Sequence, residues 1–163
     1  MKHLIIVKFQ ESDIPEVTKV MIEAFNRDSQ IHLGYNDGPD GYDDGSFLKK
    51  WALNKKATSF KILINDELAG ATVLWINQNK ENFLGCIFLH PRFEDKGIGT
   101  EIWKLIEKMY PDTKIWRTET PIFSHRNHNF YVNKCGFHVI HINNPKDLNQ
   151  GSFLLEKKMD GNK

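Results

Sequence analysis

The segment from Phe83 to Met109 constrains the fold of this chain more than any other part of the sequence. It opens with an almost wholly apolar run, Phe83 to Leu89, which predicts a strand buried on both faces and therefore placed inside a covered sheet. A loop with glycines at alternate positions follows, and then a helix that ends before Pro111. The apolar stripe of that helix is assigned to Ile98, Ile102, Leu105, Ile106 and Met109. This order of strand, glycine loop and helix predicts an α/β fold.

Gly97 and Gly99 make this loop a predicted anion site. A glycine loop that enters a helix leaves backbone N–H groups at the positive end of the helix dipole, and a side chain at either glycine would keep a phosphate away from them. Two common phosphate loops do not fit. A Walker loop needs a lysine between the last glycine and Thr100, and the dinucleotide fingerprint needs a third glycine where Ile102 stands.

The other elements surround this segment without repeats or linkers. Pro15 suits a first turn, and Asp13 and Glu16 have capping-box spacing, so a helix is predicted to begin there and to stop at the polar run 26–29. Its apolar face is Ile14, Val17, Met21, Ala24 and Phe25. Further helices are expected at 46–54 and 126–135, and further strands at 4–9, 60–64, 68–76, 114–118, 137–142 and 153–157.

Charge and cysteine usage exclude several classes of protein. The 163 residues carry 22 Lys plus Arg against 21 Asp plus Glu, whereas binding to nucleic acid or to an anionic membrane surface usually needs a basic excess. The longest apolar run is well short of the roughly 20 residues that span a bilayer, and the N-terminal run is too short for a signal peptide. Cys86 and Cys135 lie in apolar neighbourhoods and are expected to be reduced core residues of a cytoplasmic protein.

Leu89–Gly99 closely resembles the acetyl-CoA-binding motif of the GCN5-related N-acetyltransferase (GNAT) family. That motif is Gln or Arg, two residues, Gly, one residue, and then Gly or Ala. Gly97 and Gly99 fall on the two motif glycines, whereas Glu94 departs from the family at the Gln or Arg position. The segment Asn127–Phe137 looks like the second family motif, a short helix with an aromatic pair shortly before Gly-Phe.

The resemblance implies a fold, an activity and a co-substrate. The implied fold is a single α/β (α+β) domain over residues 1–163, with a mixed, mostly antiparallel sheet covered by helices on both faces. The implied activity is transfer of the acetyl group of acetyl-CoA to a primary amine by direct attack, without a metal. The loop amides would hold the pyrophosphate, and the backbone of the preceding strand would hold the pantetheine and the oxyanion. The implied acetyl-CoA-binding residues are Ile87, Phe88, Leu89, Asp95, Lys96, Gly97, Ile98, Gly99 and Thr100.

Tyr131 is the candidate acid that protonates the leaving thiolate. A phenol with a pKa of about 10 can donate a proton to a thiolate without being ionised at neutral pH. Five positions separate Tyr131 from Gly136 where the family has four, so Val132 is the alternative occupant of the tyrosine position. An aromatic ring that only packs on the sheet is the alternative role for Tyr131.

Glu119 and His125 are the candidate general bases, because each follows the end of a predicted strand, where open α/β sheets place their sites. Both residue types are also common in solvated loops, and an ordered water without a dedicated base is a third option. A rival zinc site has suitable residue types in His125, His128, Cys135, His138 and His141. The spacing of three between His138 and His141 on a strand places them on opposite faces and disfavours it.

The loop 36–45 carries four carboxylates and no basic residue, namely Asp37, Asp40, Asp43 and Asp44. Tight turns use Asp and Gly for conformational reasons, but a carboxylate cluster also attracts cations over a distance. We therefore expect a small-molecule or peptide amine as the acceptor, with a cationic amine favoured, and leave a homodimer open. The alternative function is a non-catalytic acyl-CoA-binding or sensor domain, since a fold does not specify its activity.

Overall fold

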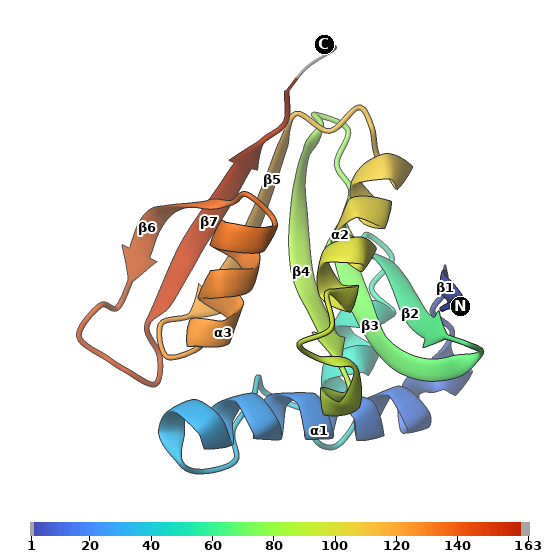
Figure 1. Ribbon diagram of the computed structural model, residues 1–163, viewed down its shortest axis with the longest axis horizontal. Helices are drawn as coiled ribbons and strands as arrows, with labels where there is room; N and C mark the ends of the chain where they lie inside the picture. Colours follow the sequence, from blue (N-terminus) through green and yellow to red (C-terminus); the bar gives the residue numbers. More distant parts are fainter. Residues whose placement is uncertain (1, 161–163) are drawn as a thin grey trace. The chain divides into compact units, whose positions relative to one another are not determined.

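The computed structural model describes residues 2–160, and its strands form a seven-stranded sheet in the order β1-β2-β3-β4-β5-β7-β6 (Figure 1). The strands are β1 (Leu4–Lys8), β2 (Thr58–Ile64), β3 (Glu67–Trp75), β4 (Glu81–Leu89), β5 (Ile115–Pro121), β6 (His138–Asn143) and β7 (Ser152–Lys158). The helices are α1 (Ile14–Leu33), α2 (Ile98–Met109) and α3 (His125–His128). Four short helical turns complete the chain: η1 (Glu11–Asp13), η2 (Leu48–Ala52), η3 (Pro91–Phe93) and η4 (Asn129–Lys134).

Strand pairing in this sheet is mostly antiparallel. The pairs β1–β2, β2–β3, β5–β7 and β6–β7 are antiparallel, whereas β4 runs parallel to β5. The predicted mixed, mostly antiparallel sheet with helices is therefore confirmed. The prediction of a single domain also included residues 1 and 161–163, which lie outside the described residues. Within residues 2–160, no helix combines the length and the apolar character that a membrane span requires.

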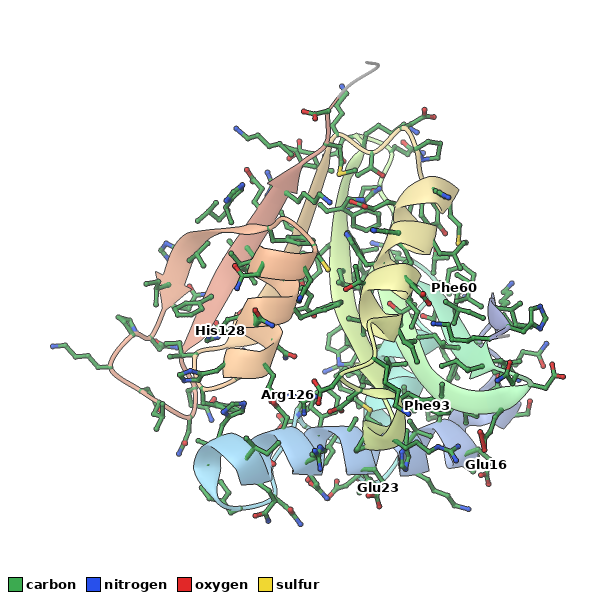
Figure 2. The ribbon with its side chains drawn as sticks, viewed as in Figure 1. Glu16, Glu23, Phe60, Phe93, Arg126 and His128 are labelled. Carbon is green, nitrogen blue, oxygen red and sulfur yellow. The ribbon has the colours of Figure 1, made fainter. Side chains whose placement is uncertain are left out.

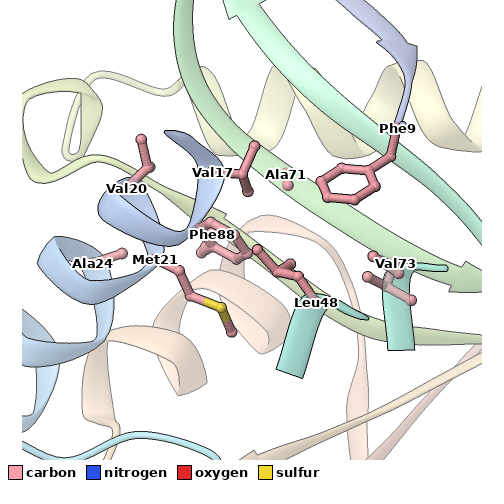
Figure 3. Packing of buried hydrophobic residues seen from close by; sticks show 10 residues of the cluster. Phe9, Val17, Val20, Met21, Ala24, Leu48, Ala71, Val73 and Phe88 are labelled. Atoms are coloured by element: carbon pink, nitrogen blue, oxygen red, sulfur yellow. The ribbon is translucent and has the colours of Figure 1, made fainter. Parts of the chain in front are cut away.

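The first compact unit contains the residues up to Trp75 together with Gly85–Glu94. Its core packs one face of α1 against side chains of β3 and β4 (Figure 3). Val17 and Met21 are fully buried there, so the helical spacing identified the inward face of α1 correctly. The buried members of this core are Phe9, Val17, Val20, Met21, Ala24, Leu48, Ala52, Ala71, Val73 and Phe88.

The C-terminal end of α1 lies beyond the predicted stop. The polar run 26–29 remains helical, and α1 ends only at Gly34, whose φ of 82° gives a left-handed cap. The Gly34 N–H donates to the carbonyls of Ser29 and Gln30. The prediction was wrong because polar residues on a helix do not end it, whereas a glycine that can adopt positive φ does.

The N-terminal end of α1 also differs from the predicted capping box. Asp13 occupies the position before α1, but its side chain makes no capping hydrogen bond to that helix. One carboxylate oxygen instead accepts from the Gln10 N–H at 2.8 Å, and the other from Lys61 Nζ at 2.8 Å. Asp13 therefore stabilises the preceding turn, η1, rather than the first turn of α1.

The last residues of β4 are fixed in the first unit by β3. The His90 N–H donates to the Ala69 carbonyl at 2.7 Å, and the Thr72 hydroxyl donates to the Cys86 carbonyl at 2.9 Å. A Cβ on Gly70 would overlap the carbonyl oxygen of Phe88, so only glycine permits this close approach of the two strands. The backbone of residues 87–89 is consequently held in a defined register.

The second compact unit contains Ile76–Leu84 and the residues from Asp95 onward. Its core packs α2 against β5, with the Trp103 and Trp116 rings in an edge-to-face contact at 5.0 Å between centroids. The predicted stripe of α2 is wrong at its C-terminal end, because Met109 is 38% exposed whereas Trp103 is 1% exposed. The large Trp103 ring packs on Trp116 and turns the buried face of α2 away from Met109.

The predicted helix at 126–135 consists of α3 followed by the π-helical turn η4. The Cys135 N–H donates to the Phe130 carbonyl at 2.9 Å, five residues earlier. Such a turn contains one residue more than an α-helical turn. The predicted helix at 46–54 is likewise a π-helical turn, η2, which is shorter than expected.

Candidate active site

The loop from Asp95 to Thr100 brings the first amides of α2 to the surface of the second unit. Gly97 precedes α2 with a left-handed backbone, φ 76° and ψ 2°, and it has no side chain with which to cap the helix. Asp95 also has a positive φ of 60°, and Asp95, Lys96 and Gly97 are all exposed. A helix N-terminus without a side-chain cap can donate its amides to a phosphate. Of the predicted pyrophosphate-binding residues, Asp95, Lys96 and Gly97 therefore form an exposed turn, whereas Ile98 is buried and Gly99 and Thr100 are half-buried.

Gly99 has a packing role in addition to the predicted access for a phosphate. A Cβ built on Gly99 would lie 3.0 Å from Cε1 and 3.4 Å from Cζ of Phe130, which is closer than ordinary carbon contacts. A Cβ on Gly97 would meet no atom within 4 Å, so positive φ alone constrains that residue. Both glycines were predicted to give a phosphate access to the amides, whereas packing against Phe130 constrains Gly99 and a left-handed backbone constrains Gly97.

Arg126 lies at this loop but was not selected from the sequence. Figure 2 shows Arg126 and His128 on α3, and Arg126 Nη2 lies 3.3 Å from Oδ1 and 3.5 Å from Oδ2 of Asp95. Arg126 precedes Phe130 by four residues, the spacing that places two side chains on one helix face. The spacing suggests that Arg126 and Phe130 contact the same element. The structure identifies this element as the start of α2, because Phe130 lies against Gly99.

Glu94, the departure from the family motif, belongs to the first unit and faces α1. Its Oε2 lies 3.7 Å from Nε of Arg27, and its side chain is only 17% exposed. A carboxylate at this depth is stabilised by an opposite charge. The side chain at the Gln or Arg position is therefore directed to Arg27 in this chain.

Ile87, Phe88 and Leu89 form the end of β4 in the first unit. The Phe88 side chain is 6% exposed and packs in the core, with its ring 5.9 Å from that of Phe25. Ile87 and Leu89 are half-buried. Because the side chain of Phe88 serves the core, a role in ligand binding at this position would fall to its backbone.

Tyr131 is buried in the second unit, at 5% exposure, with its ring centroid 5.1 Å from that of Phe130 and 5.7 Å from that of Phe137. Val132 is half-buried. The π-helical turn between Phe130 and Cys135 contains one additional residue. One additional residue in this turn is compatible with Tyr131 at the tyrosine position of the motif, and that assignment stays a prediction.

The two candidate bases have different surroundings in the second unit. Glu119 is exposed on β5, and its Oε2 accepts a short hydrogen bond from the Ser152 hydroxyl on β7. His125 begins α3 and stacks on His128, with 5.6 Å between ring centroids. His128 in turn places Nε2 at 2.9 Å from the Pro121 carbonyl. His125 therefore follows the end of β5, as the strand pattern predicts, whereas Glu119 lies within β5, because this strand continues to Pro121 and not only to the predicted end at 118.

The rival zinc hypothesis finds no support in the described part of the chain. Among residues 2–160, no three His, Cys, Asp or Glu side chains are grouped so that they could hold a metal ion. His138 and His141 are exposed on β6. Cys135 is buried, where burial raises the pKa of its thiol to about 12 despite the nearby Lys157.

Cys86 is excluded as a nucleophile by the pKa of its thiol. Burial raises the pKa of its thiol to about 12, and the hydrogen-bonded backbone nearby lowers it less. Neither Cys86 nor Cys135 forms a disulfide. Their thiols stay protonated at neutral pH, so covalent catalysis through either cysteine is not expected.

The four aspartates of the loop 36–45 differ in what they contact. Asp44 accepts from both the N–H and the hydroxyl of Ser46, at 2.9 and 2.6 Å, and these bonds lower the pKa of Asp44. Asp37 accepts from the Gly38 N–H at 2.9 Å. Asp40 and Asp43 are exposed. Asp37 and Asp44 thus shape the turn, which leaves Asp40 and Asp43 as the better candidates for attracting an acceptor.

Comparisons with known proteins agree with this geometry. A family profile described as "Acetyltransferase (GNAT) family" matches residues 19–137. A Bacillus subtilis (strain 168) protein named "Uncharacterized protein YrkN" is 38% identical over 142 residues, which cover 86% of this chain and 76% of that protein.

Solved acetyltransferases share the fold at low identity. PaiA N-acetyltransferase from Thermoplasma acidophilum, in complex with coenzyme A, superposes with a TM-score of 0.74 at 18% identity, covering 96% of this chain and 99% of its own. Spermidine N-acetyltransferase from Vibrio cholerae, in complex with CoA and spermine, gives 0.69 at 12% identity, covering 95% of each chain. The ribosomal-protein-S18-alanine N-acetyltransferase from Escherichia coli gives 0.73 at 12% identity, covering 98% of this chain and 97% of its own.

Proposed function

The chain belongs to the acetyltransferase (GNAT) family, and from this premise we propose that it transfers the acetyl group of acetyl-CoA to a primary amine. The observation that carries the proposal is the exposed glycine turn before α2, which lies within the matched residues 19–137. That turn offers uncapped amides at the positive end of a helix dipole, as a pyrophosphate requires. The solved relatives in complex with CoA support acetyl-CoA as the co-substrate.

In this proposal the two parts of acetyl-CoA meet different backbone groups. The pyrophosphate accepts hydrogen bonds from the amides of the loop Asp95–Thr100, whose glycine at Gly97 permits close approach. The pantetheine and the thioester carbonyl bind to backbone groups of Ile87, Phe88 and Leu89. The contacts of β4 with β3 hold that backbone in one register before the ligand arrives.

The proposed reaction begins with a neutral amine attacking the thioester carbonyl carbon. The C–N bond forms, the carbonyl oxygen becomes an oxyanion held by backbone N–H donors, and the C–S bond then breaks. The leaving thiolate takes a proton from the Tyr131 hydroxyl, which the amine proton later replaces through solvent. The π-helical turn after Phe130 supports Tyr131 in this role.

Glu119 and His125 remain the proposed bases that accept the proton of the acceptor ammonium, with an ordered water as the alternative. Both lie near the end of β5. Glu119→Gln and His125→Gln keep the side-chain size roughly constant while removing the base. The residue that acts as the base lowers kcat by about a hundredfold or more when replaced, whereas a small effect of both variants supports the ordered water.

The proposed acceptor is a cationic primary amine, a polyamine or an amine of a peptide, attracted by Asp40 and Asp43. Both side chains are exposed, so they act through long-range attraction rather than through a buried pair. The acceptor of the Vibrio cholerae relative, by its name spermidine, supports this class. The attraction is screened over about 8 Å at physiological salt, so it affects acceptor affinity and fades as salt rises.

A thiol-release assay tests the proposed function. Purified protein is mixed with acetyl-CoA and a panel of cationic and neutral primary amines, and free CoA is followed with a thiol reagent. The proposal predicts release that depends on both enzyme and amine, together with calorimetric binding of acetyl-CoA. Binding without amine-dependent release across the panel supports the non-catalytic acyl-CoA-binding domain, and absence of binding contradicts both functions.

A further inference from the structure

We propose that Arg126, supplied by α3, is a cationic ligand of the acetyl-CoA pyrophosphate. This inference rests on the proposed function, because it concerns the same loop and the same co-substrate. It adds a residue that lies outside the glycine motif and that the motif does not specify. The observations behind it are the charges around the loop, the contact of Arg126 with Asp95, and the packing that orients α3.

The loop needs a cation because its own charges are mainly negative. The segment 94–101 contains three carboxylates, Glu94, Asp95 and Glu101, and one basic residue, Lys96. The position where the family has Gln or Arg is Glu94 here, and Glu94 faces Arg27 in the first unit. A pyrophosphate adds further negative charge, and like charges close to one another repel. A cation from elsewhere in the second unit would correct this balance.

Arg126 is that cation. Its Nη2 lies 3.3 and 3.5 Å from the two carboxylate oxygens of Asp95, the residue at which the exposed part of the loop begins. The Arg126 side chain is 28% exposed, whereas Asp95 is 77% exposed. The better buried partner is thus the arginine, which is held over the loop while remaining accessible from solvent. Arginine also suits the task because its planar group of five N–H donors matches phosphate as well as carboxylate.

Packing explains why Arg126 is directed at the loop. Phe130, four residues later on the same helical face, lies over the first turn of α2, where its ring occupies the space that a Cβ of Gly99 would need. Two contacts therefore join this face to one turn, Phe130 at Gly99 and Arg126 at Asp95. The glycine at position 99 accordingly serves the orientation of Arg126 as well as the approach of the phosphate.

Asp95 has a defined part in this arrangement. Before the ligand binds, its carboxylate pairs with the Arg126 guanidinium. When the pyrophosphate binds, the guanidinium shares its N–H donors between Asp95 and a phosphate oxygen, so the carboxylate no longer faces the phosphate unshielded. Replacement of Arg126 would then remove an attraction and expose a repulsion at the same time.

Calorimetric titration of acetyl-CoA into the full chain and its variants tests the inference. Arg126→Gln is expected to weaken binding by about tenfold or more, since a hydrogen bond to a charged group is worth roughly 1.5–3 kcal/mol. Arg126→Lys, which keeps the charge but loses the planar donor group, is expected to lose less. The matched control is Arg117→Gln, because Arg117 of β5 also pairs with carboxylates, Glu81 and Glu156, each at 2.9 Å, and its loss should leave binding to the folded protein unchanged.

A second variant, Asp95→Asn, tests whether Arg126 acts by shielding the phosphate from the Asp95 carboxylate or only by supporting the structure of the loop. Asp95→Asn keeps the positive φ tolerable, since Asn adopts that conformation readily, and it removes the charge. In the Arg126→Gln background it should restore part of the lost affinity. A merely structural loss at Arg126 would not be rescued in this way, so absence of rescue with a folded double variant contradicts the inference.

Acetyl-3′-dephospho-CoA identifies which phosphate Arg126 meets. The inference predicts the same loss in Arg126→Gln for acetyl-CoA and for the dephospho compound, because both contain the pyrophosphate. A loss that disappears with the dephospho compound would assign Arg126 to the 3′-phosphate and overturn the inference. Unchanged affinity of Arg126→Gln would also overturn it while leaving the proposed function intact. If the unsubstituted protein fails to bind acetyl-CoA, the proposed function itself fails.

Discussion

The contact between Gly99 and Phe130 leads to a prediction that separates folding from ligand binding. In Gly99→Val the new Cβ alone would lie 3.0 Å from the Phe130 ring, whereas ordinary carbon contacts are about 3.5–4.0 Å. The ring must therefore withdraw by several tenths of an ångström, and the two methyl groups of valine require more. Overpacking of this kind costs about 1–3 kcal/mol, against a gain of a few tenths from replacing glycine in a helix. We expect a net loss of about 1–2 kcal/mol in the free energy of unfolding.

The same substitution should also weaken binding of acetyl-CoA by about tenfold or more, because the valine side chain keeps the phosphate from the first-turn amides of α2. Phe130→Leu distinguishes the two effects. In the Phe130→Leu background, Gly99→Val should cost less stability, because the clashing ring is absent, while the binding loss should remain. Urea unfolding measures the first quantity and calorimetric titration of the folded variants measures the second. Equal stability of Gly99→Val and the unsubstituted protein would refute the packing argument, and unchanged affinity would refute the phosphate argument.

Three further predictions concern the chemistry. Tyr131→Phe should lower kcat by about ten- to a hundredfold in the thiol-release assay, with little change in acetyl-CoA affinity, because only the proton donor is lost. Asp40→Asn/Asp43→Asn should raise the KM for a cationic amine at low salt and leave kcat unchanged. Burial raises the pKa values of the Cys86 and Cys135 thiols from 9.0 to about 12, so above pH 9 the folded state retains thiol protons that the unfolded state loses. The free energy of unfolding should therefore fall as the pH rises from 9 to about 12, which urea unfolding at a series of pH values measures.

Matched variants control these measurements. Val132→Ala tests the alternative occupant of the tyrosine position, and a larger kcat loss than in Tyr131→Phe would reverse the assignment. Glu16→Gln/Glu23→Gln removes two exposed carboxylates of α1, labelled in Figure 2, and should leave the KM for the amine unchanged. An equal rise in KM for this pair would attribute the effect to net charge. Replacing both cysteines by alanine should reduce the fall in the free energy of unfolding at alkaline pH.

The parts of the fold that depend on local pattern could be predicted from the sequence. The strand before the glycine loop, the loop and the following helix each have their own sequence signal, although the predicted burial of this strand on both faces was wrong, because within 83–89 only Leu84 and Phe88 are buried and Gly85 is exposed. The inward face of α1 was also predicted correctly from Val17, Met21 and Ala24. The C-terminal end of α1 was not predicted correctly. Gly34 ends the helix through its positive φ, whereas the prediction placed the end at the polar residues before Gly34.

Several other features missed from the sequence are long-range contacts. Trp103, and not the predicted Met109, belongs to the buried face of α2, because the Trp103 ring packs on Trp116 of β5. Arg126 has no local signal, since its partner Asp95 lies 31 residues away. The pairing of Glu94 with Arg27 depends equally on tertiary structure. Such residues became candidates only when the structure showed what they touch.

The π-helical turn at η4 bears on the choice between Tyr131 and Val132 for the tyrosine position of the motif. Spacing alone allowed either Tyr131 or Val132 to match the tyrosine of the family. The hydrogen bond from the Cys135 N–H to the Phe130 carbonyl spans five residues, as in a π-helical turn, and it supports Tyr131 as the proposed match. Sequence patterns do not reveal a π-helical turn, because it differs from an α-helical turn by a single hydrogen-bond register.

The amides from Asp95 to Thr100 are proposed to hold the pyrophosphate of acetyl-CoA. Backbone amide NMR can observe these groups individually. Isotope-labelled protein is titrated with acetyl-CoA and, separately, with acetyl-pantetheine, which lacks the pyrophosphate. We expect large shifts at the amides of Gly97, Ile98 and Gly99 with acetyl-CoA and only small shifts there with acetyl-pantetheine. Saturable binding of acetyl-CoA that leaves these amides unshifted would show that the loop does not hold the pyrophosphate.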